Sequence, residues 1–386
     1  MGIGGAGMSA YALVAAGFGA EVGGWDRNET PYLGPVRAAG VDVLVSPEPE
    51  PPAGFEVFVS SAYPSALGRP RAELLAELVA LTPSIVVAGA HGKTTTAAMI
   101  AFALRETDRD PSWIVGGEVP QLGANAGVGT GWLVVEGDES DRSLEALRPE
   151  LAVVTNVDLD HHATFASRAE VASLFDAWLA GVPRNVRGWE LEPFAGELGV
   201  PGDHNRRNAA CALAALELAG VPPEEARAAL AGFRGASRRF QTVGQARGVV
   251  VFDDYAHNPA KVAAAIATAR AEASRRSGRV LVVFQPHLYS RTRHSAVDLA
   301  RALAAADVVA VTGVYAAREA PVDGVTGKLV VEALARTRPG FGPAWMPSLA
   351  AAARFVARQA RPGDVLLTVG AGDVDAAGPL ILEALR

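Results

Sequence analysis

The sequence predicts an α/β protein of three domains. Short apolar runs rich in β-branched residues alternate with helical patterns along the chain, and many of these runs end in glycine-rich or polar turns. A chain of 386 residues is also too long for one ordinary hydrophobic core. We place the domains at residues 1–82, 83–234 and 235–386. Ligand-binding residues are expected just after the carboxyl ends of the parallel strands.

The first domain begins with a glycine-rich turn of the form G-x-G-x-x-G, which leads into a helix up to Ala16. A strand over 21–25 then ends at Asp26, about 20 residues further on, where nucleotide-binding units place an acidic residue for a ribose or base. A tight turn in a glycine-rich protein explains the pattern equally well. No strand precedes the first glycine, so either its start is missing or a neighbouring element covers that position. Strands at 41–45 and 56–59 and a helix at 71–80 follow.

The second domain opens with a glycine- and threonine-rich turn between a strand over 85–87 and a helix over 97–104, namely Gly89, Ala90, His91, Gly92, Lys93, Thr94, Thr95 and Thr96. This order points free backbone N–H groups and the helix dipole at an anion. Lys93 adds a charge for the β- and γ-phosphate oxygens, and Thr94 or Thr95 offers a hydroxyl to Mg²⁺. The spacing is shorter than G-x-x-x-x-G-K-[ST], because Val87 stands where that pattern has its first glycine. We interpret the stretch as a nucleoside-triphosphate loop; the alternative is an ordinary turn with an exposed lysine.

Two further strands of this domain, 132–135 and 151–154, run into carboxylates and histidines, namely Glu136, Asp138, Glu139, Asp141, Asp158, Asp160, His161 and His162. Oxygen and imidazole ligands suit the Mg²⁺ or Mn²⁺ that a triphosphate requires. The alternatives are a hydrated acidic loop and ordinary loop histidines. The region 181–201 has room for one short strand, and the polar turn after it either binds a ligand or caps the alanine-rich helix that follows.

The third domain has four strands that each end in a polar cluster, over 248–252, 280–284, 308–311 and 365–369, with a further helix expected over 296–305. A single cluster could be turn chemistry. Four clusters in one domain predict a crevice lined by polar residues, namely Asp253, Asp254, Tyr255, His257, Gln285, His287, Arg291, Tyr315, Arg318 and Asp373.

Composition limits the classes of function. A net charge of -7 argues against a nucleic-acid partner held by a basic surface. The one cysteine, Cys211, excludes an internal disulfide and lies among alanines, which favours a small core residue over a nucleophile. The sequence has no cleavable leader pattern and no apolar run near the roughly 20 residues of a membrane span. We therefore expect a cytoplasmic protein without membrane insertion.

Seven segments together resemble the Mur ligases in type and order, namely residues 2–9, 89–96, 138–141, 204–209, 253–257, 284–292 and 370–373. The resemblance implies an N-terminal Rossmann-like domain for a UDP-sugar, a central P-loop ATPase-like sheet, shortened here, and a C-terminal Rossmann-like domain for an amino acid. It implies ATP and Mg²⁺ as cofactors, and UDP-N-acetylmuramate and L-alanine as substrates in peptidoglycan precursor synthesis. A monomer or weak homodimer is expected.

The resemblance also implies roles for individual residues. Those expected to be catalytic are Lys93, Glu136, His161, His257 and Arg291. Those expected to bind the nucleotide are Gly89, His91, Gly92, Lys93, Thr94, Thr95, Asn205, Asn208 and Arg239. Those expected to bind substrates are Gly4, Gly5, Gly7, Met8, Ser9, Asp26, Ser61, Asp254, Tyr255, His287 and Arg318. The expected metal ligands are Thr94, Glu136 and His161.

The implied reaction has two steps. The sugar carboxylate takes the γ-phosphoryl group to give an acyl phosphate, and the amine of alanine then displaces phosphate, with closure of the domains excluding water. Leu288 stands where many members have an arginine, which leaves Arg291 for the alanine carboxylate. No lysine occurs between His161 and Ala180, so a carbamylated lysine is not available there. The alternatives are a sister ligase that adds a ready-made tripeptide in recycling, and a nucleotide-binding relative without ligase activity.

Overall fold

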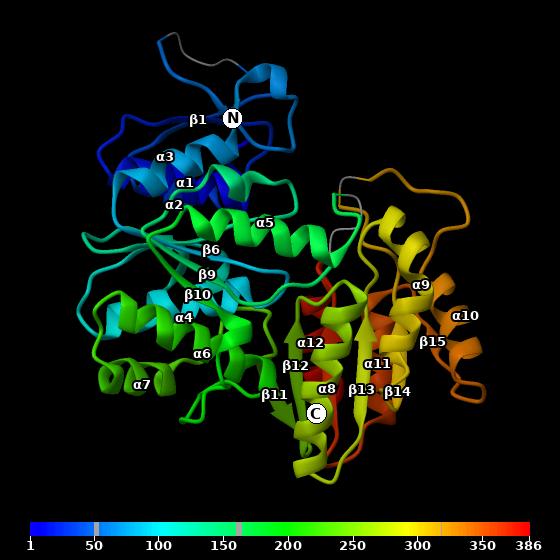
Figure 1. Ribbon diagram of the computed structural model, residues 1–386. Helices are drawn as coiled ribbons and strands as arrows, with labels where there is room; N and C mark the ends of the chain where they lie inside the picture. The colour runs from blue at the N-terminus through cyan, green and yellow to red at the C-terminus, as the bar shows by residue number, and fades with distance from the viewer. Residues whose placement is uncertain (50–53, 160–163, 318) are drawn as a thin grey trace. The chain divides into compact units, whose positions relative to one another are not determined.

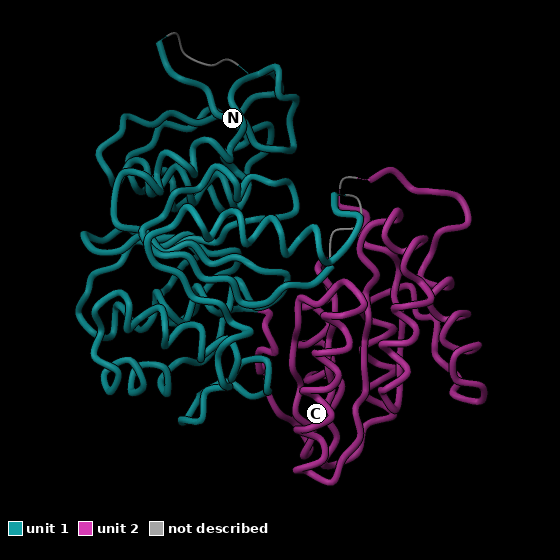
Figure 2. Tube along the Cα trace, viewed as in Figure 1, with its two compact units in different colours: residues 1–237 teal, residues 238–386 magenta. Residues whose placement is uncertain are grey.

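A computed structural model of the chain describes residues 1–49, 54–159, 164–317 and 319–386. The chain divides into two compact units, residues 1–237 and 238–386 (Figures 1 and 2). Each unit contains a six-stranded, mostly parallel sheet with helices packed against it. The predicted α/β class is confirmed.

The large sheet of the first unit has the strand order β10-β9-β5-β8-β6-β7. Its strands are parallel except β7, which pairs antiparallel with β6 at one edge. All five residues of β5 are buried, as expected of a strand covered by helices on both faces. The strands are β5 (Ser84–Ala88), β6 (Ser112–Val119), β7 (Ala124–Gly127), β8 (Leu133–Glu136), β9 (Leu151–Val154) and β10 (Arg184–Arg187).

Helices cover both faces of this sheet (Figure 1). One face packs against α4 (Lys93–Glu106), α6 (Asp203–Leu218) and α7 (Pro223–Gly232). The other packs against α1 (Ala6–Gly17), α3 (Arg71–Leu81) and α5 (Arg168–Ala180). Cys211 is 1% exposed in the first of these cores, and burial raises its pKa to about 11, so the expectation of a core cysteine is confirmed.

The N-terminal part of this unit holds two small parallel sheets, β1 (Gly23–Asp26) with β2 (Asp42–Val45), and β3 (Phe58–Val59) with β4 (Arg69–Pro70). The first residues of the chain lie between them. The backbone nitrogens of Gly2 and Ile3 donate to the Trp25 carbonyl at 2.8 and 3.1 Å, and the Met1 nitrogen donates to the Phe58 carbonyl at 2.8 Å. These residues thus occupy the place of the strand that the sequence pattern lacks. Helix α2 (Leu33–Ala38) packs beside them on Ile3 and Val41.

The sheet of the second unit has the order β11-β12-β16-β13-β14-β15 and is parallel except for the edge strand β11. One face packs against α8 (Pro259–Arg275), α9 (Tyr289–Leu303) and α10 (Lys328–Thr337), and the other against α11 (Leu349–Gln359) and α12 (Ala377–Ala384). The strands are β11 (Gln241–Ala246), β12 (Val249–Asp254), β13 (Val280–Phe284), β14 (Val308–Val311), β15 (Ala344–Trp345) and β16 (Val365–Val369).

Two helices begin earlier than the sequence predicts. Helix α4 starts at Lys93 instead of Ala97, because its threonines are buried and already helical. Helix α9 starts at Tyr289 instead of Ala296, because its first two turns are polar and resemble a loop. The region 181–201 contains the single strand β10 and a short 3₁₀ turn, Gly188–Glu190, as expected of so short a segment.

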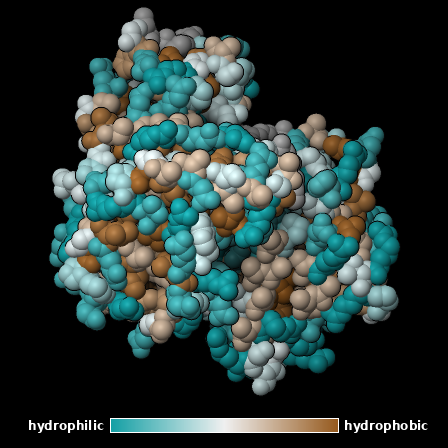
Figure 3. Space-filling view, in the orientation of Figure 1, coloured by the Kyte–Doolittle hydropathy of each residue, from teal (hydrophilic) through white to brown (hydrophobic). Residues whose placement is uncertain are grey.

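Within the part of the chain that the structure describes, no helix is long and apolar enough to cross a membrane. On the viewed face, apolar residues lie among hydrophilic ones over both units (Figure 3).

Candidate active site

The phosphate loop connects β5 to α4 and depends on two glycines with left-handed backbone. Gly89 has φ 122° and Gly92 has φ 84°. A Cβ on Gly89 would lie 2.3 Å from Thr155 Oγ1, and one on Gly92 would lie 2.2 Å from Asn208 Oδ1. Larger residues are therefore excluded at both positions by conformation and by space.

Residues after β9 hold this loop in place. The Thr155 hydroxyl donates to the His91 carbonyl at 2.6 Å. The Asn156 side chain accepts from the His91 backbone N–H at 3.0 Å and donates to the His91 carbonyl at 2.8 Å. The His91 ring lies 3.6 Å from Asp158. Thus the loop follows β5, and residues after the neighbouring strand β9 fix its conformation.

Lys93 lies over the loop and contacts a carboxylate. Its Nζ donates to the Gly89 carbonyl at 2.7 Å and to the two Glu139 oxygens at 3.0 and 2.9 Å. Glu139 is 2% exposed, so this is a buried ion pair. Sequence reasoning placed Glu139 in an acidic loop but assigned it no role, because the sequence does not show which of several clustered carboxylates is buried.

Thr94 and Glu136 meet beside the lysine. The Thr94 hydroxyl donates to Glu136 Oε2 at 3.0 Å, and Glu136 Oε1 accepts from the Gly116 backbone N–H. A hydroxyl oxygen next to a carboxylate is a donor set that Mg²⁺ accepts together with water and phosphate oxygens. No group of three or more histidine, cysteine or acidic residues surrounds a potential metal position among the described residues. The third expected ligand, His161, lies outside the described residues.

Asn205 and Asn208 lie in the first turns of α6 and are 4% and 5% exposed. Asn205 Nδ2 donates to the Pro201 carbonyl at 2.7 Å, and Asn208 Nδ2 donates to Asn205 Oδ1 at 3.3 Å. Asn208 also lies against Gly92 of the loop, because a Cβ on Gly92 would be 2.2 Å from Asn208 Oδ1. Thr95, also expected to bind nucleotide, is 7% exposed within α4.

The N-terminal glycine turn binds the side chain of Asp26. The Gly4 backbone N–H donates to Asp26 Oδ2 at 2.8 Å, and a Cβ at Gly4 would lie 2.9 Å from that oxygen. Gly5 precedes α1, and Gly7, Met8 and Ser9 lie in its first turns, with Met8 and Ser9 buried. Ser61 is exposed in the turn after β3. The structure thus brings the turn and Asp26 together and leaves Ser61 at the surface.

In the second unit, two acid–base groups with perturbed pKa values lie at the end of β12 and just after it. Burial raises the pKa of Asp254 to about 6, while its carboxylate accepts from the Phe240 and Ala256 backbone N–H groups at 2.9 and 2.8 Å. Burial and the positive charges of Lys261 and Arg291 lower the pKa of His257 to about 3. His257 is therefore a neutral imidazole at neutral pH.

The residues after β13 complete an aromatic and cationic cluster. The His287 ring lies 5.8 Å from that of His257 and stacks on Tyr315 at 5.9 Å. Arg291, in the first turn of α9, lies 3.1 Å from His287 Nδ1. Leu288 has φ 68°, and its backbone N–H bonds the Tyr315 carbonyl at 2.9 Å. Arg318 lies outside the described residues.

Arg238 joins two strand ends and was missed from the sequence. Its Nε donates to Asp253 at 3.0 Å, and its other nitrogens donate to the Gly372 and Gly370 carbonyls at 2.6 and 2.8 Å. Asp253 is 2% exposed, which places this ion pair inside the fold. Next to it, the Arg239 guanidinium lies 5.4 Å from the centre of the Tyr255 ring.

Comparison with known proteins gives matches over both units. Residues 87–186 match the family model of the Mur ligase middle domain, and residues 238–372 match that of the Mur ligase glutamate ligase domain. The UDP-N-acetylmuramate–L-alanine ligase of Renibacterium salmoninarum is 40% identical over 450 residues, covering 100% of this chain and 95% of that protein. The enzyme of the same name from Rubrobacter xylanophilus is 39% identical over 443 residues, covering 100% and 99%.

Two solved structures of ligases also match this chain along almost its whole length. The crystal structure of UDP-N-acetylmuramate–alanine ligase from Thermotoga maritima matches with a TM-score of 0.77 and 26% identity, over 99% of this chain and 97% of that chain. A murein peptide ligase from Psychrobacter arcticus, 22% identical over 100% of this chain and 97% of that chain, shares the fold with a TM-score of 0.64. The alignments with the two 39–40% identical relatives extend over more positions than the 386 residues of this chain, so those relatives contain residues without a counterpart here.

Proposed function

This chain belongs to the Mur ligase family, and on that premise we propose that it uses ATP to join L-alanine to the lactyl carboxylate of UDP-N-acetylmuramate in peptidoglycan precursor synthesis. The α/β fold and three-domain architecture are those of the family. The observation that carries the catalytic part of the proposal is the convergence of Lys93, Thr94 and Glu136 at the ends of β5 and β8.

In the first step, the lactyl carboxylate attacks the γ-phosphorus of ATP and ADP leaves, which gives an acyl phosphate. Carboxylate and triphosphate repel each other, so the site must neutralise negative charge. The loop N–H groups between Gly89 and Lys93 and the Lys93 ammonium supply that neutralisation. For this, Lys93 must exchange its contact with Glu139 for phosphate oxygens.

Mg²⁺ would be held by Thr94 and Glu136, with His161 as the further ligand, and when bound it neutralises phosphate charge. The nucleotide-binding residues act mainly through shape. Gly89 and Gly92 let the backbone approach the phosphates, and Asn208 leaves no room for a side chain at Gly92.

In the second step, the alanine amine attacks the acyl carbon, and inorganic phosphate leaves from a tetrahedral intermediate. Arg291 is the cation for the alanine carboxylate. His257 is neutral because of its low pKa, so it is a weak base and would act by accepting a hydrogen bond from the attacking amine; His287 lies beside both groups.

The remaining parts of the proposal concern the surroundings of the enzyme. The net charge of -7 supports the absence of a nucleic-acid partner. We place the reaction in the cytoplasm, where its nucleotide substrates are available, and assign the protein as a monomer or weak homodimer.

The test is phosphate release from ATP with UDP-N-acetylmuramate, offering L-alanine, glycine, L-serine and the ready-made tripeptide in turn. We expect release that depends on both the sugar nucleotide and L-alanine. Lys93→Ala should abolish it, whereas Lys328→Ala, at an exposed lysine of α10, should not. Release with the tripeptide and not with L-alanine would contradict the assigned substrate, and turnover by Lys93→Ala would contradict the assigned role.

A further inference from the structure

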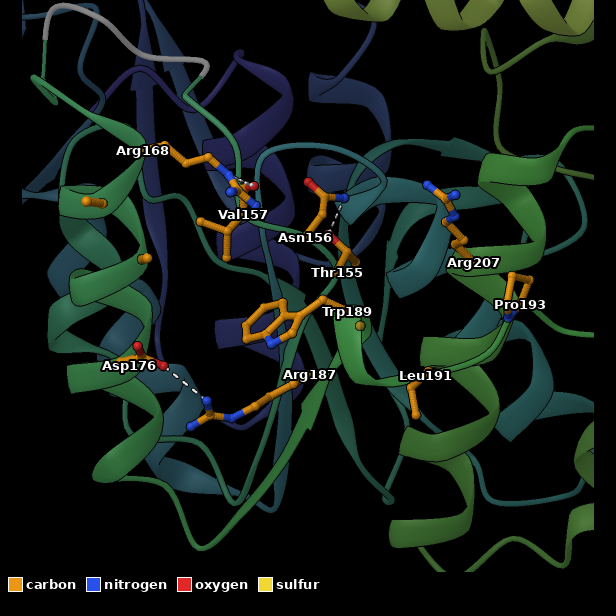
Figure 4. A pocket seen from close by; sticks show the side chains of 13 residues that line it. Thr155, Asn156, Val157, Arg168, Asp176, Arg187, Trp189, Leu191, Pro193 and Arg207 are labelled. Carbon is orange, nitrogen blue, oxygen red and sulfur yellow. Dashed lines mark hydrogen bonds and ion pairs between the residues drawn. The ribbon is translucent and has the colours of Figure 1, made fainter.

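A pocket of about 690 Å³ lies at the carboxyl ends of β9 and β10, between α5 and the N-terminus of α6. Trp189 lies in the middle of it, with Arg168 and Arg207 on opposite sides (Figure 4). This volume is within the range of small-ligand sites. None of its residues has a role in the reaction proposed above.

Part of this pocket is built from a segment that lies outside both family-model matches. The middle-domain match ends at residue 186 and the next begins at 238, so Trp189, Leu191, Pro193 and Arg207 fall between the two family models. The chain is also shorter than its 39–40% identical relatives.

The pocket carries positive charge that its neighbours do not fully neutralise. Arg187 is paired with Asp176 at 3.1 Å. Arg168 uses its Nε to donate to the Val157 carbonyl at 3.0 Å, which leaves its two terminal nitrogens. Among the described residues, Arg207 has no hydrogen bond or ion pair, and both Arg168 and Arg207 are exposed. Two guanidinium groups therefore face the pocket from opposite walls.

Trp189 presents a planar apolar surface between these cations. It is 46% exposed, unlike the buried tryptophans of the same unit, Trp25, Trp113 and Trp178. The preceding residue fixes its place, because a Cβ on Gly188 would lie 2.1 Å from the Thr155 carbonyl oxygen and 2.8 Å from Cys211 Sγ. The absence of a side chain at Gly188 lets the 3₁₀ turn pack directly on the residue after β9, with the indole directed into the pocket.

The same wall adjoins the phosphate loop. Thr155 and Asn156 line the pocket, and both bond the His91 backbone of the loop. A molecule in the pocket thus contacts residues that already fix the loop.

We propose that this pocket binds the base and an anionic group of a nucleotide, with the base stacked on Trp189 and the anionic group held by Arg207. Indole rings stack on bases irrespective of base identity, and guanidinium groups bind phosphate. The nucleotide is either the ATP whose phosphates occupy the loop or a second nucleotide, and the two are distinguished below.

The experiment is titration of the full-length protein with ADP and with UMP, followed by tryptophan fluorescence and by calorimetry. We expect a quench that is present in the wild type and absent in Trp189→Phe. Arg207→Gln should weaken binding about ten-fold, as expected for loss of a charge-assisted contact. Arg301→Gln, which removes the same charge from an exposed pair on α9, should leave binding unchanged.

Lys93→Ala separates the two sources. If the base belongs to the loop-bound nucleotide, Lys93→Ala weakens the Trp189 quench by ADP, and UMP does not compete. If the nucleotide is a second one, Lys93→Ala leaves the quench unchanged. The proposal is overturned if wild type and Trp189→Phe give the same quench and Arg207→Gln binds as tightly as wild type. Either result is independent of alanine-dependent turnover, so failure of the ligase proposal would be seen separately.

Discussion

The buried ion pair between Lys93 and Glu139 allows a quantitative prediction. The two charges are 2.9 Å apart, and the side chains are 18% and 2% exposed. At an effective dielectric constant of about 20, the attraction is roughly 6 kcal/mol, most of which offsets desolvation. Removing one partner deprives the other of this ion pair. We expect Lys93→Met, which retains the aliphatic volume, to lower the free energy of unfolding by about 3 kcal/mol, since the carboxylate that remains is the more buried partner.

Removing the carboxylate instead of the lysine should lower the free energy of unfolding by a smaller amount. In Glu139→Gln the remaining lysine is partly exposed and can reach water, so we expect a loss of about 1 kcal/mol. The double variant should be about 2 kcal/mol more stable than the sum of the single effects predicts.

Urea unfolding measured by tryptophan fluorescence suits this test, because five of the six tryptophans lie in the first unit and only Trp345 in the second. Circular dichroism should report the second unit as well, since each unit can unfold in its own transition. Arg301→Gln, from an exposed pair, should change stability by less than about 0.5 kcal/mol. Single effects that add to within about 0.5 kcal/mol would refute the coupling.

Three further predictions follow from the site. Gly92→Ala should abolish ADP binding in calorimetry, because its Cβ would lie 2.2 Å from Asn208 Oδ1 and the backbone there is left-handed. The far-ultraviolet circular dichroism should stay unchanged. A wild-type affinity for ADP would contradict this prediction by showing that the loop adjusts. Asp254 has a pKa of about 6 in the folded protein against an ordinary value of 3.8, so the folded state holds this proton more tightly. The free energy of unfolding should therefore fall by about 3 kcal/mol as the pH rises from 4 to 6. Asp254→Asn should lack this fall, and a variant whose stability has the same pH dependence as the wild type would contradict the assignment. His257 has a pKa of about 3 in the folded protein against an ordinary value of 6.5, so the free energy of unfolding should fall as the pH falls from 6.5 toward 3. The loss should be smaller in His257→Gln. An NMR titration of His257 with a midpoint near pH 6.5 would contradict this prediction.

Much of the fold could be predicted because each central strand is a short β-branched run that ends in a polar turn. The strand before the phosphate loop, Ile85 to Val87, is such a run, and it is fully buried. Strands β6 and β7 escaped prediction because glycines interrupt them. Gly116 is required there, since a Cβ would lie 2.9 Å from Glu136 Oε1, yet in sequence it resembles a turn.

The site residues that a sequence motif requires for backbone conformation could be predicted. Those whose role depends on burial in the folded protein could not. Gly89 and Gly92 could be recognised from the loop pattern and have positive φ. Glu139, by contrast, is one of several acidic residues in a row, and only packing distinguishes it. Trp189 was equally hidden, because its placement depends on the contact of Gly188 with Thr155. His161 and Arg318 lie outside the described residues and remain predictions.

The packing of α1 and α3 on the large sheet of the first unit determines which recombinant fragments can be made. Met8, Tyr11 and Val14 of α1 and Leu75 and Leu78 of α3 share one core with the sheet. A fragment that starts at residue 83 would uncover that face to water and is expected to aggregate during expression. Attempts to crystallise the nucleotide-binding part separately, or to exchange it between relatives, should therefore keep residues 1–237 together.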